Sequence, residues 1–333
     1  MPHRQAVPNI GEVYYMTKSY IGIDVSKKNL QVFVFPEEKD NTFDNTNEGI
    51  KKLITFLNAY DVALIALEAT GRLEEKCAYT LLEADYSVSM LNSDTIQSFR
   101  RILNIKAKTD HKDAKLIARY AQIYNPPPMK KLTLEEKKLY LLSTRRDELV
   151  EYRIKEKQRL SVKDDEYSVK SINNVLACVN KEIEDCEEEI MKLIKMYPQK
   201  EKIFDILNSV PGVGMLVAIS MLANLPELGQ LSAKKISALA GVCPINVESG
   251  TIRKFKSMKY CGRVRVRRCL YLAVLSGKRY NTFLKTIYEK EIKKGKCKKV
   301  AMGICMRKLI ILLNSLVKEE RNFNKEYKKQ KAA

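Results

Sequence analysis

Histidine is nearly absent from this 333-residue sequence, which contains only His3 and His111. Its eight cysteines are scattered, and no two of them have Cys-x-x-Cys spacing. Because structural zinc sites are built from closely spaced cysteines and histidines, the sequence argues against such a site. Scattered cysteines without an N-terminal signal peptide are typical of reduced thiols in a cytoplasmic protein.

Long apolar runs and an acidic charge balance are also missing. No apolar stretch approaches the roughly 18 residues of a membrane span, so we expect no membrane partner. Lys and Arg number 60 against 40 Asp and Glu, a net charge of +20. This excess favours a nucleic-acid partner over a merely soluble basic protein. An anionic membrane surface would need an amphipathic or polybasic anchor, and none stands out.

The N-terminal part reads as a mixed α/β domain over residues 18–127. Residues 1–17 lack apolar periodicity and are expected to form a disordered leader, with Met16 a candidate natural start. Strand-like and helix-like segments then alternate, which favours a mixed sheet. The expected strands are 20–25, 31–35, 62–67 and 86–91, and the expected helices are 47–60, 73–84 and one that begins near Asp110.

A helical arm is expected over residues 132–198, after the Pro126-Pro-Pro stop signal. Apolar residues from Ile172 to Tyr197 alternate steps of four and three, which indicates a heptad seam. A bend near Asp164-Asp-Glu-Tyr predicts a helical hairpin or coiled-coil arm; one long surface helix is the alternative.

The C-terminal section, residues 200–325, is expected to be mostly helical. It opens with a tight turn, Gly212-Val-Gly214, ahead of an apolar helix. Such a turn is similar to the helix–hairpin–helix element, whose backbone N–H groups bind phosphate, so both glycines are candidate nucleic-acid-binding residues. A simple connecting turn is equally consistent with this sequence.

Four acids form the main candidate site. Asp24 and Glu68 each end an apolar strand-like run, and Asp110 and Asp113 lie three apart at the start of a helix. An acid at the end of a buried strand is costly unless it is paired, hydrogen-bonded or bound to metal. Oxygen ligands without histidine suit Mg²⁺ or Mn²⁺. Alternatively, these acids cap helices and turns or pair with lysines.

A second candidate is Ser249, at the edge of a strongly basic stretch. From Gly250 through Tyr288 there is no acid, and 11 residues are Lys or Arg. Such a stretch favours binding of phosphate groups. No histidine is available as a base, so on residues alone Ser249 reads as a turn serine. The candidate nucleic-acid-binding side chains are Arg253, Lys254, Lys256, Lys259, Arg263, Arg265, Arg267 and Arg268.

These motifs resemble a known family when taken in order. Tyr20-Ile-Gly-Ile-Asp-Val, Leu67-Glu-Ala-Thr-Gly and Lys108-Thr-Asp-x-x-Asp-Ala look like the DEDD motif of RuvC-like, RNase H-like transposase domains. Val210-Pro-Gly-Val-Gly, Glu248-Ser-Gly and Gly262-Arg-x-x-x-Arg-Arg are similar to the second domain of the same transposases. Their founder is insertion sequence one hundred and ten, and the match runs from about residue 19 to 318.

The resemblance implies a bacterial recombinase that excises and inserts its own element. It implies that Asp24, Glu68, Asp110 and Asp113 bind metal, and that Ser249 becomes linked to a DNA 5′ phosphate. It also implies a structured guide RNA and a homo-oligomer, a dimer or a tetramer. The segment after Ser249 is more basic and less glycine-rich than the family pattern, which leaves Ser257 as a fallback nucleophile.

Two other functions remain open from the sequence. One is a junction-resolving nuclease in which only the four acids act and water is the nucleophile. The other is an inactive nucleic-acid-binding scaffold, which the retention of all four acids disfavours.

Overall fold

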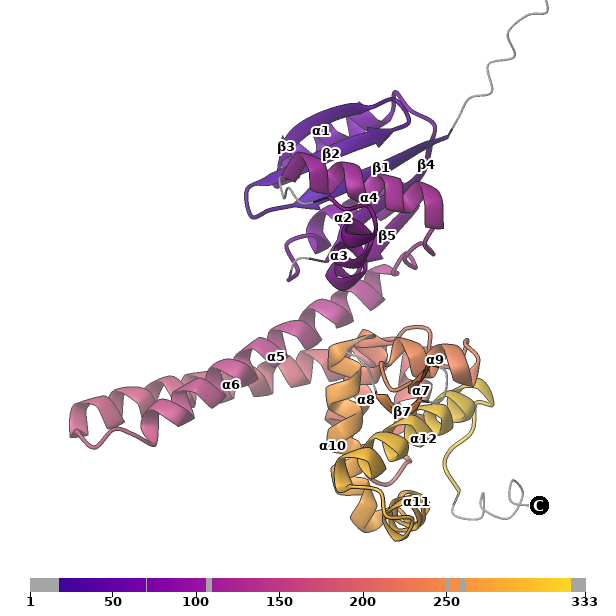
Figure 1. The fold of residues 1–333 in the computed structure, drawn as a ribbon. Helices are drawn as coiled ribbons and strands as arrows, with labels where there is room; N and C mark the ends of the chain where they lie inside the picture. The colour runs from indigo at the N-terminus through magenta and orange to yellow at the C-terminus, as the bar shows by residue number, and fades with distance from the viewer. Residues whose placement is uncertain (1–17, 70, 106–109, 250–251, 258–261, 325–333) are drawn as a thin grey trace, which may run out of the picture. The chain divides into compact units, whose positions relative to one another are not determined.

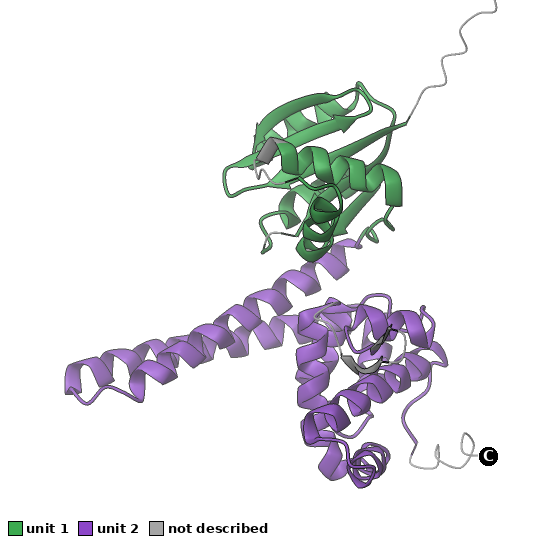
Figure 2. Ribbon diagram, viewed as in Figure 1, with its two compact units in different colours: residues 1–131 green, residues 132–333 purple. Residues whose placement is uncertain are grey.

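The computed structural model describes residues 18–69, 71–105, 110–249, 252–257 and 262–324 (Figure 1). For Asp110, His111 and the described parts of 245–257, the backbone alone is described. The expected leader, with Met16, lies outside the described residues. The chain divides into two compact units, residues 1–131 and 132–333 (Figure 2).

Unit 1 is built on a five-stranded mixed sheet with the order β3-β2-β1-β4-β5. The first three strands are antiparallel, whereas β4 and β5 run parallel to β1. This confirms the mixed sheet expected from the sequence. Strand β3 was not expected, because it is a mostly exposed edge strand with one apolar residue, Phe43. The strands are β1 (Ser19–Val25), β2 (Asn29–Phe35), β3 (Lys39–Asp44), β4 (Val62–Glu68) and β5 (Val88–Leu91).

Helices cover both faces of this sheet. On one face, α1 and α2 pack on the odd-numbered residues of β1 and β4, such as Ile23 and Leu67. On the other, α3 and α4 pack on residues such as Leu64 and Ala66. Successive side chains of a strand point to opposite faces, so alternate positions serve the two layers. The helices are α1 (Asn47–Leu57), α2 (Glu75–Glu83), α3 (Ser93–Ile102) and α4 (Asp110–Tyr124).

Unit 2 begins with a helical hairpin formed by α5 (Leu134–Leu160) and α6 (Glu166–Met196). Thr133 starts α5 in a capping box, and Asp165 caps α6 at the expected bend. Leu149 of α5 packs against Val179 and Ile183 of the predicted seam. The middle of the seam is therefore buried between the two helices, which form a hairpin and not one long surface helix.

The rest of unit 2 is a helical bundle with one small two-stranded sheet. The base of the hairpin belongs to its core, because Leu139, Ile190 and Leu193 pack in the same cluster as the C-terminal helices. The β-hairpin was not expected from the sequence. The elements are α7 (Pro198–Asn208), α8 (Met215–Asn224), α9 (Ala233–Leu239), β6 (Ile245–Ser249), β7 (Ile252–Ser257), α10 (Val264–Tyr280), α11 (Thr282–Lys293) and α12 (Lys298–Lys318).

Helix α12 corrects one expectation. By length and composition it is apolar enough to cross a membrane, although no apolar run of that length was expected from the sequence. Arg307 and Lys308 interrupt the run, which hides it from a search for uninterrupted apolar residues. However, 67% of the apolar window is buried inside the structure. Its residues, including Leu309 and Leu313, are part of the bundle core, which is the placement of a core helix.

Candidate active site

Asp24 and Glu68 occupy equivalent positions on neighbouring parallel strands. Ile23 pairs with Leu67 in the register of β1 and β4, and each acid is the next residue along its strand. Neighbouring strands lie about 4.8 Å apart. Both acids point to the face opposite Ile23 and Leu67, which is the face covered by α4. Both are half-buried.

Helix α4 brings the other two acids to this part of the sheet. It crosses β1 at Gly22, where a Cβ would lie 2.1 Å from the Ala114 carbonyl oxygen and 2.4 Å from the Ala118 nitrogen. The absence of a side chain at Gly22 therefore permits the close approach. The helix runs back across the sheet, so its N-terminal turn lies toward the end where β1 stops (Figure 1). That turn carries Asp110 and Asp113.

Asp113 is buried and forms an ion pair with Arg100 of α3. The side-chain exposures are 11% for Arg100 and 5% for Asp113. The side chain of Asp110 lies outside the described part of the structure. The sequence held no signal for Arg100, because the helix that carries it, α3, was not predicted.

The donor chemistry of these acids fits a hard divalent cation, for which carboxylate oxygens are the preferred ligands. Two of them are adjacent on one sheet face, and the turn that carries the other two lies over the same face. Among the side chains that the structure describes, no three His, Cys, Asp or Glu residues gather closely enough to hold a metal ion. Asp24, Glu68 and Asp113 therefore do not form such a group by themselves, and the side chain of the fourth acid, Asp110, is outside the described set.

Ser249 is the last residue of β6. Its backbone pairs with Ile252, the first residue of β7, so it lies at the end of the small sheet where the chain passes from β6 to β7. Ser257, the fallback candidate, ends β7 and pairs with Ile245 at the far end of this hairpin. The two serines therefore lie at opposite ends of the same small sheet. Their side chains, and those of Arg253, Lys254 and Lys256, are outside the description, as is all of Lys259.

Three of the candidate nucleic-acid-binding arginines contact other parts of unit 2. Arg263 makes a bidentate pair with Glu227, at 2.6 and 2.7 Å, and also donates to the Asn224 carbonyl. Arg265 donates to the Thr144 hydroxyl of α5. Nη1 of Arg268 lies 3.3 Å from Oε1 of Glu151, also on α5. These contacts give the arginines a structural role beside the nucleic-acid role that their charge suggested.

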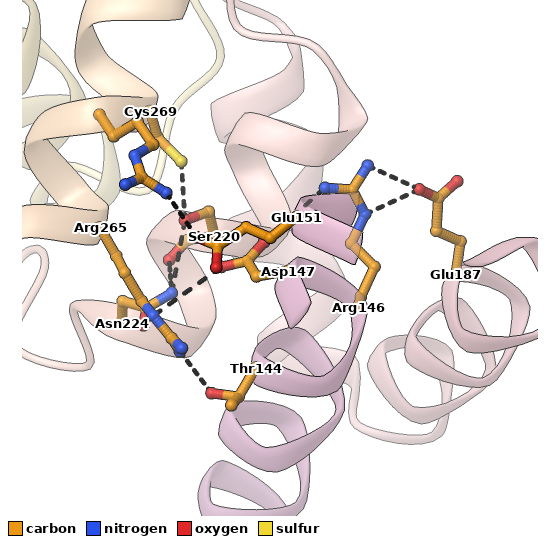
Figure 3. Close-up of polar contacts among 10 residues, drawn as sticks. Thr144, Arg146, Asp147, Glu151, Glu187, Ser220, Asn224, Arg265 and Cys269 are labelled. Atoms are coloured by element: carbon orange, nitrogen blue, oxygen red, sulfur yellow. Dashed lines mark hydrogen bonds and ion pairs between the residues drawn. The ribbon is translucent and has the colours of Figure 1, made fainter. Parts of the chain in front are cut away.

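Figure 3 shows the polar network in which the hairpin meets the bundle. Oδ2 of Asp147, on α5, lies 3.8 Å from Nε of Arg265, on α10. Arg146, the residue before it, pairs with Glu187 of α6 at 2.9 Å. Burial raises the pKa of Asp147, although Arg265, Arg146 and Arg268 oppose this shift. The carboxylate is therefore held in a site that only partly compensates its charge.

The Gly-Val-Gly turn is positioned largely by packing. Gly212 has φ +98°, and a Cβ there would lie 2.5 Å from the Cα of Gly277 on α10. Asn281 holds the same turn through a hydrogen bond of 3.0 Å to the Pro211 carbonyl. Gly214 differs, because it starts α8 with nothing within 4 Å of its Cβ position. Of the two candidates, Gly214 is the one whose surroundings leave room for a ligand.

Comparisons with known proteins agree with the order of these elements. Residues 21–163 match a DEDD family model described as a transposase, and residues 204–289 match the transposase family IS116/IS110/IS902. The pilin gene-inverting protein of Moraxella bovis is 30% identical over 323 residues, which cover 93% of this chain and 99% of that protein. The pilin gene-inverting protein of Moraxella lacunata is equally similar. The chain belongs to the IS116/IS110/IS902 family of transposases.

Proposed function

We propose that this transposase cuts and rejoins DNA through a metal-dependent acid site in unit 1 and a serine nucleophile in unit 2. The observation that carries the proposal is the placement of Asp24 and Glu68 at equivalent ends of adjacent strands, beneath the helix that carries Asp110 and Asp113. The strand order, an antiparallel meander joined to two parallel strands, also suits a RuvC-like domain.

In this proposal the four acids hold Mg²⁺ or Mn²⁺, which when bound supplies positive charge to the scissile phosphate. Asp24 and Glu68 supply oxygens from the rigid sheet. Asp110 and Asp113 supply them from the first turn of α4, whose distance from the sheet is set by the contact at Gly22. Precise placement of this kind is what positions reacting groups for phosphoryl transfer.

Ser249 is the proposed nucleophile. Its hydroxyl oxygen forms a bond to the phosphorus of a DNA 5′ phosphate while the bond from phosphorus to the 3′ oxygen breaks. The serine loses its proton and the departing 3′ oxygen gains one, so a 3′ hydroxyl is released. Attack by a 3′ hydroxyl on the phosphoserine reverses the step and rejoins the strand. The position of Ser249 at the end of β6, in a two-stranded sheet, supports access of a substrate to this residue.

We further propose that a structured guide RNA selects the DNA and that the active species is a homo-oligomer. The net charge of +20 supports binding of long polyanions. The Moraxella relatives carry the name of pilin gene-inverting proteins, so the proposed chemistry includes inversion of a DNA segment as one of its outcomes.

A denaturing gel tests the nucleophile. Wild type, Ser249→Ala and Ser257→Ala are incubated with guide RNA, end-labelled DNA and Mg²⁺, and a label that stays with the protein marks a covalent adduct. We expect the adduct in wild type and Ser257→Ala and its loss in Ser249→Ala. An adduct in Ser249→Ala would show that the assignment is wrong. Cleavage without any adduct would favour the junction-resolving nuclease.

Asp24→Asn tests the acid site. We expect it to abolish both adduct and recombination while the far-UV circular dichroism and the affinity for guide RNA stay at wild-type values. Asp61→Asn serves as a control, since that acid is exposed and precedes β4. Full activity of Asp24→Asn would refute the role of the acids.

A further inference from the structure

Helix α3 contacts two of the elements that carry the proposed metal ligands, the end of strand β4 and the first turn of helix α4. At its start, the Ser93 hydroxyl donates to the carbonyl of Ala69, the residue that follows Glu68, at 2.9 Å. Near its end, Arg100 pairs with Asp113 of α4. The helix therefore fixes the end of β4 relative to the first turn of α4. The residues between these anchors, Ile96 and Phe99, are buried against the sheet and α4, which makes the connection firm.

The ion pair between Arg100 and Asp113 engages one atom on each side. Nη2 of Arg100 donates to Oδ1 of Asp113. The Asp113 side chain makes no other hydrogen bond or ion pair with the described residues, so Oδ2 keeps its lone pairs available. On the arginine, Nε is buried and has no hydrogen-bond partner among the described residues. A bidentate pair would use two guanidinium nitrogens and both carboxylate oxygens, whereas this pair is joined through Nη2 and Oδ1.

We propose that Arg100 is a positioning residue for the acid site: by holding Oδ1, it keeps Oδ2 of Asp113 turned toward the divalent cation. The inference rests on the proposed function of the four acids. A carboxylate that ligates a metal through one oxygen is commonly oriented by a hydrogen bond to the other. The burial of both side chains means that solvent competes little for this contact.

The Arg100 guanidinium could instead compete with the metal for the Asp113 carboxylate. In that case, removal of the arginine side chain would strengthen metal binding. If it orients Asp113, its removal weakens metal binding. The sign of the change in affinity therefore separates the two roles.

The test measures Mn²⁺ binding to the full-length chain by the electron paramagnetic resonance of free Mn²⁺, without DNA or RNA. Wild type is compared with Arg100→Ala, Arg100→Lys and Asp113→Asn. We expect Arg100→Ala to weaken binding by about 10–100-fold, the usual effect of losing such an orienting contact. Arg100→Lys should recover part of the loss, because its charge remains. Arg101→Ala is the matched control, since this neighbour is exposed on the same helix, and it should bind Mn²⁺ like wild type.

Unchanged or tighter Mn²⁺ binding by Arg100→Ala would overturn the inference. If Arg100→Ala does not fold by circular dichroism, Arg100→Gln replaces it, with the same two outcomes. A different result would show that the proposed acid site is wrong. If Asp113→Asn binds Mn²⁺ as wild type does, Asp113 is no metal ligand, and the inference about Arg100 fails with it. If Asp113→Asn loses Mn²⁺ and the Arg100 variants do not, only the role of Arg100 is wrong.

Discussion

Gly22→Ala is expected to lower recombination by displacing α4, beyond any effect of the substitution on the stability of the fold. The new methyl group would lie 2.1 Å from one backbone atom of α4 and 2.4 Å from another, where about 3.0 Å is the closest approach that real Cβ atoms make. Neither atom can rotate away, so the helix must retreat from β1 by about 1 Å. Overpacking of this kind costs typically about 1–3 kcal/mol, and the backbone contact places this variant at the upper end of the range.

The same displacement moves the turn that carries Asp110 and Asp113. A misplacement of about 1 Å can lower the rate of a positioned reaction on the order of 10²-fold. We therefore expect Gly22→Ala to lose about two orders of magnitude in recombination per folded molecule. Stability is followed by thermal melting in far-UV circular dichroism. Recombination is measured well below the melting temperature, between two plasmid-borne sites.

Gly49→Ala is the matched control. Its methyl would lie 2.0 Å from the Asp44 carbonyl, an equally severe backbone clash, but α1 lies on the opposite face of the sheet from α4. It should lower the melting temperature and leave recombination per folded molecule near wild type. Equal losses of activity in both variants would show that activity follows stability rather than the position of α4. Wild-type behaviour of Gly22→Ala would refute the packing argument altogether.

Three further predictions concern packing, thiols and charge. Ile190→Ala should destabilise unit 2 by about 2–5 kcal/mol, because Ile190 is fully buried, whereas Met196→Ala, 70% exposed, should melt like wild type. Cys77, whose pKa is raised to about 12 by burial, should resist iodoacetamide at pH 8 while exposed Cys178 is alkylated, as mass spectrometry would report. Burial raises the pKa of Asp147, so the native state favours its protonated form, and the stability that this form provides is lost as pH rises through the raised pKa. At pH 7 the melting temperature of Asp147→Asn should therefore be no lower than that of wild type. Any excess over wild type should shrink as the pH is lowered toward 3.8, because Asp147 of the wild type then becomes protonated. A melting temperature of Asp147→Asn far below that of wild type at pH 7 would contradict this reasoning.

Period-two and heptad patterns predicted much of this fold correctly. The strands that carry Asp24 and Glu68 were predictable because a short run of apolar residues that includes β-branched Ile and Val is typical of a buried strand. The hairpin followed from the seam through Ile183 and Ile190, which is buried as expected. Helix α3 was missed because Ile96 and Phe99 are its only buried residues and they stand among polar ones.

Contacts between distant parts of the chain were beyond the sequence. Arg265 and Thr144 are 121 positions apart, and no local pattern joins them. The basic stretch that contains Arg265 therefore suggested nucleic acid alone, although part of its charge is used in contacts within unit 2. The strands β6 and β7 were missed for another reason, because alternation of apolar and polar residues in so short a segment is also typical of a loop.

The shared core at the base of the hairpin gives the arm a fixed direction as well as a fixed length. Because Leu139 and Ile190 are packed among the C-terminal helices, the arm cannot swing without opening that core. A helix of 31 residues such as α6 extends about 46 Å, at 1.5 Å per residue. A partner that binds the far end of the arm therefore also fixes the position of the bundle, which carries Ser249. Lengthening both helices by one heptad would move the tip of the arm by about 10 Å with almost no rotation, so the length of the arm would set the distance between the bundle and any partner bound at the tip.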